Sequence, residues 1–136
     1  MINLTNIELF EDYSIITNGS LIYDLHSDYL CKSLEFDSFK KKLIINFIAR
    51  EGKPAPDKDV SIEFHDAQPA KLSLFFPYSD DASTLNIIYR GRFEKDGQLL
   101  EIAESCERYF YFELQTGDTF EIYARDVYFS INSNSR

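Results

Sequence analysis

The chain of 136 residues suits one domain with one core, which we place at residues 1–131, ahead of a flexible polar tail at 132–136. Its 12 Phe and 9 Tyr favour pleated strands and exclude a disordered protein. A formal net charge of −9 argues against a nucleic-acid partner, because such binders carry the opposite sign. It favours either simple solubility or a basic protein partner.

The first expected element is a short helix near the start of the chain. Thr5 and Glu8 have the spacing of a capping box, and Leu4 and Leu9 have that of the accompanying hydrophobic staple. A helix that ends near residue 12 or 13 satisfies this pattern, and an edge strand is the alternative.

A hairpin is predicted next, over residues 13–24. Asn18-Gly19 lies between two apolar runs and suits a type I′ turn. In that register Ile16 faces Leu21 and Ile15 faces Ile22, so we expect both faces of the hairpin to be covered.

Two further strands are predicted at residues 30–36 and 42–50, joined by a turn whose lysines at 40–42 are solvated. The second strand is apolar on both sides, with Leu43, Ile45 and Phe47 on one face and Ile44 and Ile48 on the other. Such a strand belongs inside a sheet rather than at its edge.

A loop at residues 51–59, which contains a glycine and two prolines, precedes the clearest alternation in the chain. There Val60, Ile62 and Phe64 alternate with polar residues, which predicts a half-buried strand. Another strand is expected at 71–76, with Leu72, Leu74 and Phe76 inward.

The region after residue 84 predicts a hairpin about Asp96-Gly97. Strands at 85–93 and 98–103 would place Phe93 opposite Leu100 and Arg92 opposite Glu101, a favourable charge pair. A one-turn helix is an option at 102–106.

Residues 108–131 predict the central hairpin of the fold. A three-residue loop, Thr116-Gly117-Asp118, with Gly117 left-handed, aligns Phe110, Phe112 and Leu114 with Ala124, Ile122 and Phe120 on one apolar face. After Arg125 the apolar residues change from even to odd positions, so we expect a bulge or corner at Arg125-Asp126.

The opposite face of this hairpin is the candidate binding surface. It would pair Tyr109 with Arg125, Tyr111 with Tyr123, and Glu113 with Glu121. Tyr and Arg are enriched in binding hot spots, and two opposed glutamates favour a nearby basic group, in this chain or in a partner. The alternative is that the face is buried or purely structural.

Together these elements predict an all-β, mainly antiparallel fold of about nine strands, arranged as a two-layer sandwich or a flattened barrel. No opening segment resembles a secretion signal and no run approaches the length of a membrane span, so we expect a cytoplasmic protein without a membrane partner. Cys31 and Cys106 are expected as free thiols, with a disulfide between them left open.

The sequence offers no reaction centre. His26 and His65 are isolated, neither cysteine has a nearby histidine, and the five glycines form no phosphate-binding loop. We therefore predict a protein that is not an enzyme, with no catalytic residues, no metal site and no cofactor.

Four segments carry a resemblance to a known group of proteins. They are residues 34–37, 42–45, 60–67 and 120–127, which read LEFD, KLII, VSIEFHDA and FEIYARDV. Across about half the chain this strand pattern resembles the small acidic β proteins among bacterial toxin-neutralising immunity proteins. The resemblance implies a non-enzymatic protein that blocks a toxin by binding it, and it supplies no binding residues.

Our functional hypothesis is therefore protein binding through the Tyr/Glu face, with a basic toxin as the implied partner. The alternatives are a β protein that holds a small apolar ligand in an aromatic-lined cavity, and a purely structural or interaction domain.

Overall fold

The computed structural model describes residues 1–5, 13–73 and 84–132. Strands make up all of its regular secondary structure in these ranges. The strands are β1 (Ile2–Asn3), β2 (Ile15–Asn18), β3 (Leu21–Asp24), β4 (Tyr29–Asp37), β5 (Lys42–Ala49), β6 (Asp59–His65), β7 (Gln68–Ser73), β8 (Leu85–Gly91), β9 (Phe93–Lys95), β10 (Gln98–Leu100), β11 (Arg108–Leu114), β12 (Thr119–Ala124) and β13 (Asp126–Ile131).

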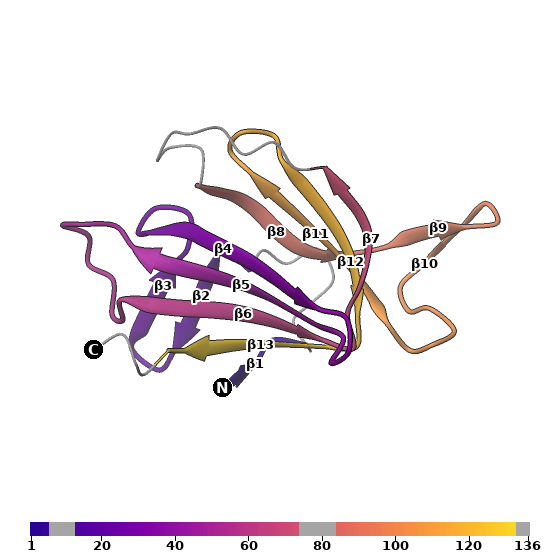
Figure 1. Ribbon diagram of the computed structural model, residues 1–136, viewed down its shortest axis with the longest axis horizontal. Coiled ribbons are helices and arrows are strands. Elements are labelled where there is room, and N and C mark those ends of the chain that lie inside the picture. The colour runs from indigo at the N-terminus through magenta and orange to yellow at the C-terminus, as the bar shows by residue number, and fades with distance from the viewer. Residues whose placement is uncertain (6–12, 74–83, 133–136) are drawn as a thin grey trace.

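Two antiparallel sheets form the two layers of a sandwich (Figure 1). The larger sheet has the order β1-β13-β6-β5-β4, and the second has the order β7-β12-β11-β8. The sheets are not closed into a barrel, so the sandwich is the correct one of the two predicted architectures. Strand β5 lies between β6 and β4, which confirms the interior position predicted from its two apolar faces.

Aromatic side chains fill the space between the layers. Phe64 of β6 meets Phe110 of β11 at a ring-centroid distance of 5.3 Å, and Phe112 meets Phe120 at 4.8 Å. The predicted inward residues Val60, Ile62 and Phe64 are fully buried, as are the inward residues of β11 and β12. The alternation of apolar and polar residues therefore identified the correct face of each of these strands.

The chain passes from one layer to the other at Arg125. Strand β12 ends at Ala124 in the second sheet, and β13 begins at Asp126 in the first. The Arg125 amide donates a hydrogen bond to the His65 carbonyl at 3.0 Å, which holds the corner against β6. This corner confirms the predicted break in the apolar alternation.

The β11–β12 hairpin has the predicted three-residue loop with a left-handed glycine, but the loop lies one residue earlier. The amide of Gly117 donates to the Leu114 carbonyl and the amide of Leu114 donates to the Asp118 carbonyl, each at 2.9 Å, with Gly117 at φ +92°. Residues 115–117 thus form the loop. Every pair is shifted by two residues, so Tyr109 faces Tyr123 and Tyr111 faces Glu121.

The register of the β2–β3 hairpin also differs from the prediction by two residues, but here the turn lies one residue later than predicted. Its turn is at Gly19-Ser20, so that Ile16 faces Tyr23 and Thr17 faces Ile22. Ile16 and Tyr23 are buried, while Ile15 and Ile22 are each 57% exposed. The prediction that both faces are covered was therefore wrong.

The two short helices of the prediction have different outcomes. Residues 2–3 form an edge strand on β13, and the Thr5 hydroxyl accepts a hydrogen bond from the Val127 amide at 2.8 Å; the helix predicted to follow Thr5 lies outside the described residues. Residues 102–106 form a turn instead of a helix, with Cys106 at φ +67°.

Two further expectations fall partly outside the described residues. Strand β7 begins at Gln68, before the predicted start, and the inward direction expected of Leu72, Leu74 and Phe76 lies outside what the structure describes. In the tail, the Asn132 amide donates to the Asp59 carbonyl at 3.0 Å, and residues 133–136 are not described.

Candidate interaction surface

The outer face of the four-stranded sheet carries the candidate surface. Its central part consists of six side chains from β8, β11 and β12, which we call the tyrosine face: Tyr89, Tyr109, Tyr111, Glu113, Glu121 and Tyr123. All six are half-buried, because they alternate with the core residues of their strands and so point away from the core.

Each glutamate of the tyrosine face accepts a hydrogen bond from a tyrosine. Tyr109 Oη donates to Glu121 Oε1 at 2.6 Å, and Tyr111 Oη donates to Glu113 Oε2 at 2.7 Å. Asn86 Nδ2 donates to the other oxygen of Glu113 at 2.8 Å. The bonds from Tyr111 and Asn86 lower the pKa of the Glu113 carboxyl, because they favour its charged form.

The rings of the tyrosine face pack against one another. Tyr89 and Tyr111 lie 5.4 Å apart between centroids, and Tyr109 and Tyr123 lie 5.8 Å apart. A Cβ atom added to Gly91 would lie 3.0 Å from Tyr89 and 3.3 Å from Tyr109, so both rings lie directly against this glycine. Rings held in this way lose little conformational freedom on binding.

The charges on this face are arranged differently from the prediction. Glu113 and Glu121 are not opposed: Glu113 faces Thr119, and Glu121 faces Tyr111 on one side and Lys71 of β7 on the other. A basic residue of the same chain thus lies beside one of the two carboxylates.

Five of the six predicted binding residues share this surface, and Arg125 does not. Arg125 lies at the corner between the sheets, where its Nη2 donates to the Ser105 carbonyl at 3.0 Å and its Nε lies 3.9 Å from Asp66 Oδ2. Tyr89 belongs to the surface and was missed, because only the strand order places β8 beside β11.

A hollow of about 300 Å³ adjoins the tyrosine face at Tyr123. Phe93 and Tyr123 form an edge-to-face pair in its wall, with centroids 5.3 Å apart. Its polar lining residues are Gln68, Glu94, Lys95 and Glu107, and two alanines complete it.

Comparison with known proteins gives no relative for this chain. It matches no protein-family model, no characterised protein and no solved structure. The arrangement of its own side chains is therefore the basis for any functional proposal.

The side chains that most often bind metals or act in catalysis are scattered over the described residues. No group of three or more His, Cys, Asp or Glu there could hold a metal ion. His26 Nδ1 lies 2.5 Å from the Leu85 carbonyl oxygen, and His65 Nε2 lies 3.5 Å from Glu63 Oε1. Cys31 and Cys106 are free, and burial raises the pKa of the Cys31 thiol to about 12.

Residues 1–5, 13–73 and 84–132 include no apolar helix of membrane-spanning length.

Alkaline conditions should weaken the tyrosine face. Burial, followed by the bond to Glu113, raises the pKa of Tyr111 from 10.0 to about 12, and burial with the bond to Glu121 also raises that of Tyr109. The unfolded chain releases these protons near pH 10. We therefore expect their contribution to the free energy of unfolding to be complete below pH 10 and to fall as the pH rises above 10, in the case of Tyr111 until about pH 12.

Urea unfolding at a series of pH values measures this effect. Tyr111→Phe should make the alkaline decline shallower, because it removes one of the hydroxyl groups whose pKa the fold raises. Part of the decline should remain in Tyr111→Phe, because burial raises the pKa of Tyr29 to about 12 as well. Identical declines in the wild type and Tyr111→Phe would contradict this account.

Proposed function

We propose that this chain is a non-enzymatic protein-binding domain whose tyrosine face contacts a basic partner. The observation that supports this most strongly is the outer face itself, where packed tyrosines and hydrogen-bonded glutamates stand half-exposed on a rigid sheet. Tyrosine is among the residues enriched in binding hot spots, because it combines a large ring with a polar tip.

The charge of the chain supports a basic partner over a neutral one. A net charge of −9 attracts a cationic protein over a distance of about a Debye length and raises the rate of encounter. The free state of Cys31 and Cys106 supports a reducing compartment such as the cytoplasm as the place where this happens. The resemblance to bacterial immunity proteins extends the proposal to neutralisation of a basic toxin.

The small-ligand alternative has weaker support. It needs an interior cavity lined by aromatic residues, whereas the ring pairs Phe64–Phe110, Phe112–Phe120 and Tyr23–Phe129 occupy the space between the layers. The hollow at Tyr123 lies outside this space, beside the tyrosine face, where it is available to a bound protein.

A peptide library displayed on phage tests the proposal and does not require the natural partner. Peptides selected on the wild-type chain should be enriched in Lys and Arg. The double variant Glu113→Lys/Glu121→Lys should bind them about tenfold more weakly and associate with them more slowly, with a flatter dependence on salt, because it reverses the charge at the proposed contact.

The matched control is Glu35→Lys/Glu51→Lys, which changes two exposed glutamates away from the tyrosine face. Each exchange adds two units of charge, so both double variants carry −5 in place of −9. Equal weakening in the two variants would show that only net charge matters, and unchanged binding by Glu113→Lys/Glu121→Lys would remove the assigned surface.

A further inference from the structure

The β9–β10 hairpin projects from the sandwich (Figure 1). The hollow beside Tyr123 is lined in part by residues 93–95 of this hairpin. Ala103 and Glu107 of the following turn form another part of its wall, and β7 and β12 contribute Gln68, Ala70 and Tyr123. Because Tyr123 belongs both to the hollow and to the tyrosine face, a partner seated on that face is within reach of the hollow.

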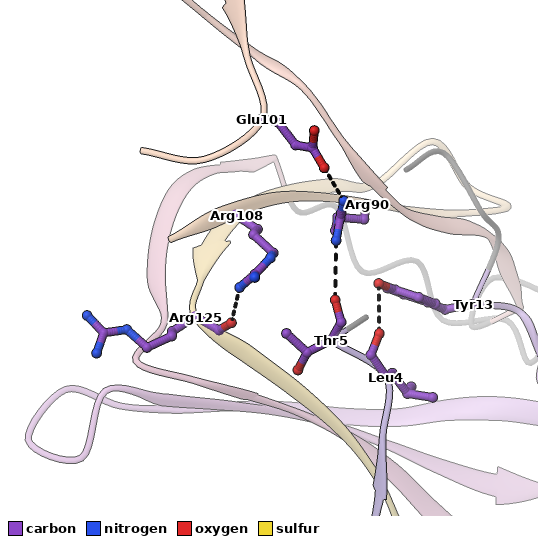
Figure 2. Close-up of polar contacts among 7 residues, drawn as sticks. All are labelled: Leu4, Thr5, Tyr13, Arg90, Glu101, Arg108 and Arg125. Carbon is purple, nitrogen blue, oxygen red and sulfur yellow. Dashed lines mark hydrogen bonds and ion pairs between the residues drawn. The ribbon is translucent and has the colours of Figure 1, made fainter. Parts of the chain in front are cut away.

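Hydrogen bonds from arginines fix the two segments that frame the hollow (Figure 2). Arg90 forms an ion pair with Glu101, directly after β10, and so ties the base of the hairpin to β8. Arg108 Nη1 donates to the Arg125 carbonyl at 2.9 Å, and Arg125 Nη2 donates to the Ser105 carbonyl at 3.0 Å. Polar contacts therefore anchor the two segments that frame the hollow to β8 and to the corner at Arg125.

The wall combines aromatic rings with carboxylates. Phe93 and Tyr123 meet at an interplanar angle of 82°, and Phe93 is almost fully buried. Glu107 is half-buried, and its Oε2 accepts a hydrogen bond from Ser105 Oγ at 2.9 Å, which orients the carboxylate. Aromatic rings beside carboxylates attract a cation by two mechanisms, the ring quadrupole and the opposite charge.

Lys95 is the one basic residue among those that line this hollow, and its charge is already compensated. Its Nζ lies 3.3 Å from Glu104 Oε1, and Glu104 does not belong to the lining. Glu94 and Glu107 therefore leave the hollow with a negative charge.

We infer, on the basis of the proposed function, that this hollow receives a positively charged side chain of the partner, with arginine preferred over lysine. A volume of about 300 Å³ is at the lower end of the range for small-molecule sites and suits one long side chain. Arginine is preferred because its planar guanidinium stacks on a ring while it donates two parallel hydrogen bonds to a carboxylate. The hollow thus gives the proposed interface a specific anchor at its edge.

Titration of the full chain with N-acetyl-arginine amide tests this anchor without a protein partner. We expect saturable changes in the NMR amide signals of residues 93–95, 103–107 and 123, with a Kd in the millimolar range usual for so small a ligand. N-acetyl-citrulline amide, which has a similar shape without the charge, should bind at least about fivefold more weakly, and N-acetyl-lysine amide should fall between the two.

Two variants locate the site, and a third serves as a control. Glu107→Gln and Tyr123→Leu should each weaken binding of the arginine amide at least about fivefold, whereas Glu51→Gln, in a distant exposed loop, should not change it. The amide spectrum of each variant reports whether the fold is intact, so the loss in Glu107→Gln can be assessed even where Tyr123→Leu disturbs packing.

The outcomes separate this anchor from the proposed function. Equal binding of the arginine and citrulline amides, or signal changes away from the hollow, would overturn the anchor. Selected peptides that bind through the tyrosine face, together with no response to the arginine amide, would overturn the anchor alone. An arginine amide that binds in the hollow, together with peptides indifferent to Glu113→Lys/Glu121→Lys, would support the anchor and contradict the assigned surface.

Discussion

Replacing Phe110 with alanine should lower the free energy of unfolding by about 3–5 kcal/mol. Phe110 is fully buried in β11, and its ring contacts Phe64 of the facing sheet at 5.3 Å and Tyr13 at 6.0 Å between centroids. Removing the ring deletes packing against both and leaves a cavity between the layers that neighbouring rings cannot fill without leaving their rotamers.

Tyr111→Ala is the matched control, since Tyr111 is the next residue of the same strand and points to the opposite side. We expect Tyr111→Ala to lower the free energy of unfolding by less than half as much as Phe110→Ala does. The Tyr111 ring is half-exposed and touches Tyr89 rather than the core. Equilibrium unfolding in urea measures both variants, and similar m-values would show that the transitions are comparable. A greater loss in Tyr111→Ala than in Phe110→Ala would mean that β11 presents its other face to the core.

The faces of the strands were predictable from the sequence, whereas their registers were not. Side chains alternate along a strand with a period of two, so a shift of two residues leaves every side chain on the same face. Both Phe110 opposite Ala124, as predicted, and Phe110 opposite Ile122, as observed, satisfy the apolar pattern. The turn geometry decides between them, and in this hairpin Gly117 takes the last loop position rather than the middle one.

The exposure of a strand depends on what covers it, which local sequence does not contain. Ile15 and Ile22 are apolar residues of the kind that usually lies buried, yet both are exposed. Only the other face of the β2–β3 hairpin packs against the sandwich, where the rings of Tyr23 and Phe129 lie 4.8 Å apart between centroids. Short strands were missed for a related reason. Elements of two or three residues, such as β1, carry no periodic pattern, which is why the prediction of about nine strands fell below the observed number.

Only part of the candidate surface was predicted, because local sequence does not show which distant strands pair. Tyr109, Tyr111 and Tyr123 lie on strands joined by a short loop, so their common face follows from the hairpin alone. Tyr89 and Lys71 reach that face only because β8 and β7 pair with β11 and β12 across long stretches of sequence. Arg125 was assigned to the face by continuing the alternation one residue past the point where the chain leaves the sheet.

The second large effect should come from Arg90, a buried arginine on the inner side of β8. Its side chain is 10% exposed; Nη2 pairs with Glu101 Oε1, Nη1 donates to the Thr5 carbonyl at 3.3 Å, and Nε has no hydrogen-bond partner among the described residues (Figure 2). Glu101→Ala should lower the free energy of unfolding by about 2 kcal/mol, because it leaves a buried guanidinium without its counter-charge. The loss should stay below that of a fully buried pair, since the Glu101 side chain is 45% exposed.

A second substitution should reverse much of this loss. Arg90→Met in the Glu101→Ala background removes the buried charge and keeps an apolar side chain of similar length, so we expect at least half of the lost stability to return. Glu104→Ala is the control, because its pair with Lys95 is exposed on both sides and should contribute less than about 0.5 kcal/mol. Urea unfolding of the four proteins compares these values directly. A double variant less stable than Glu101→Ala would show that Arg90 stabilises the fold even without Glu101, through the Thr5 carbonyl and its own packing, and would contradict the account of an uncompensated buried charge.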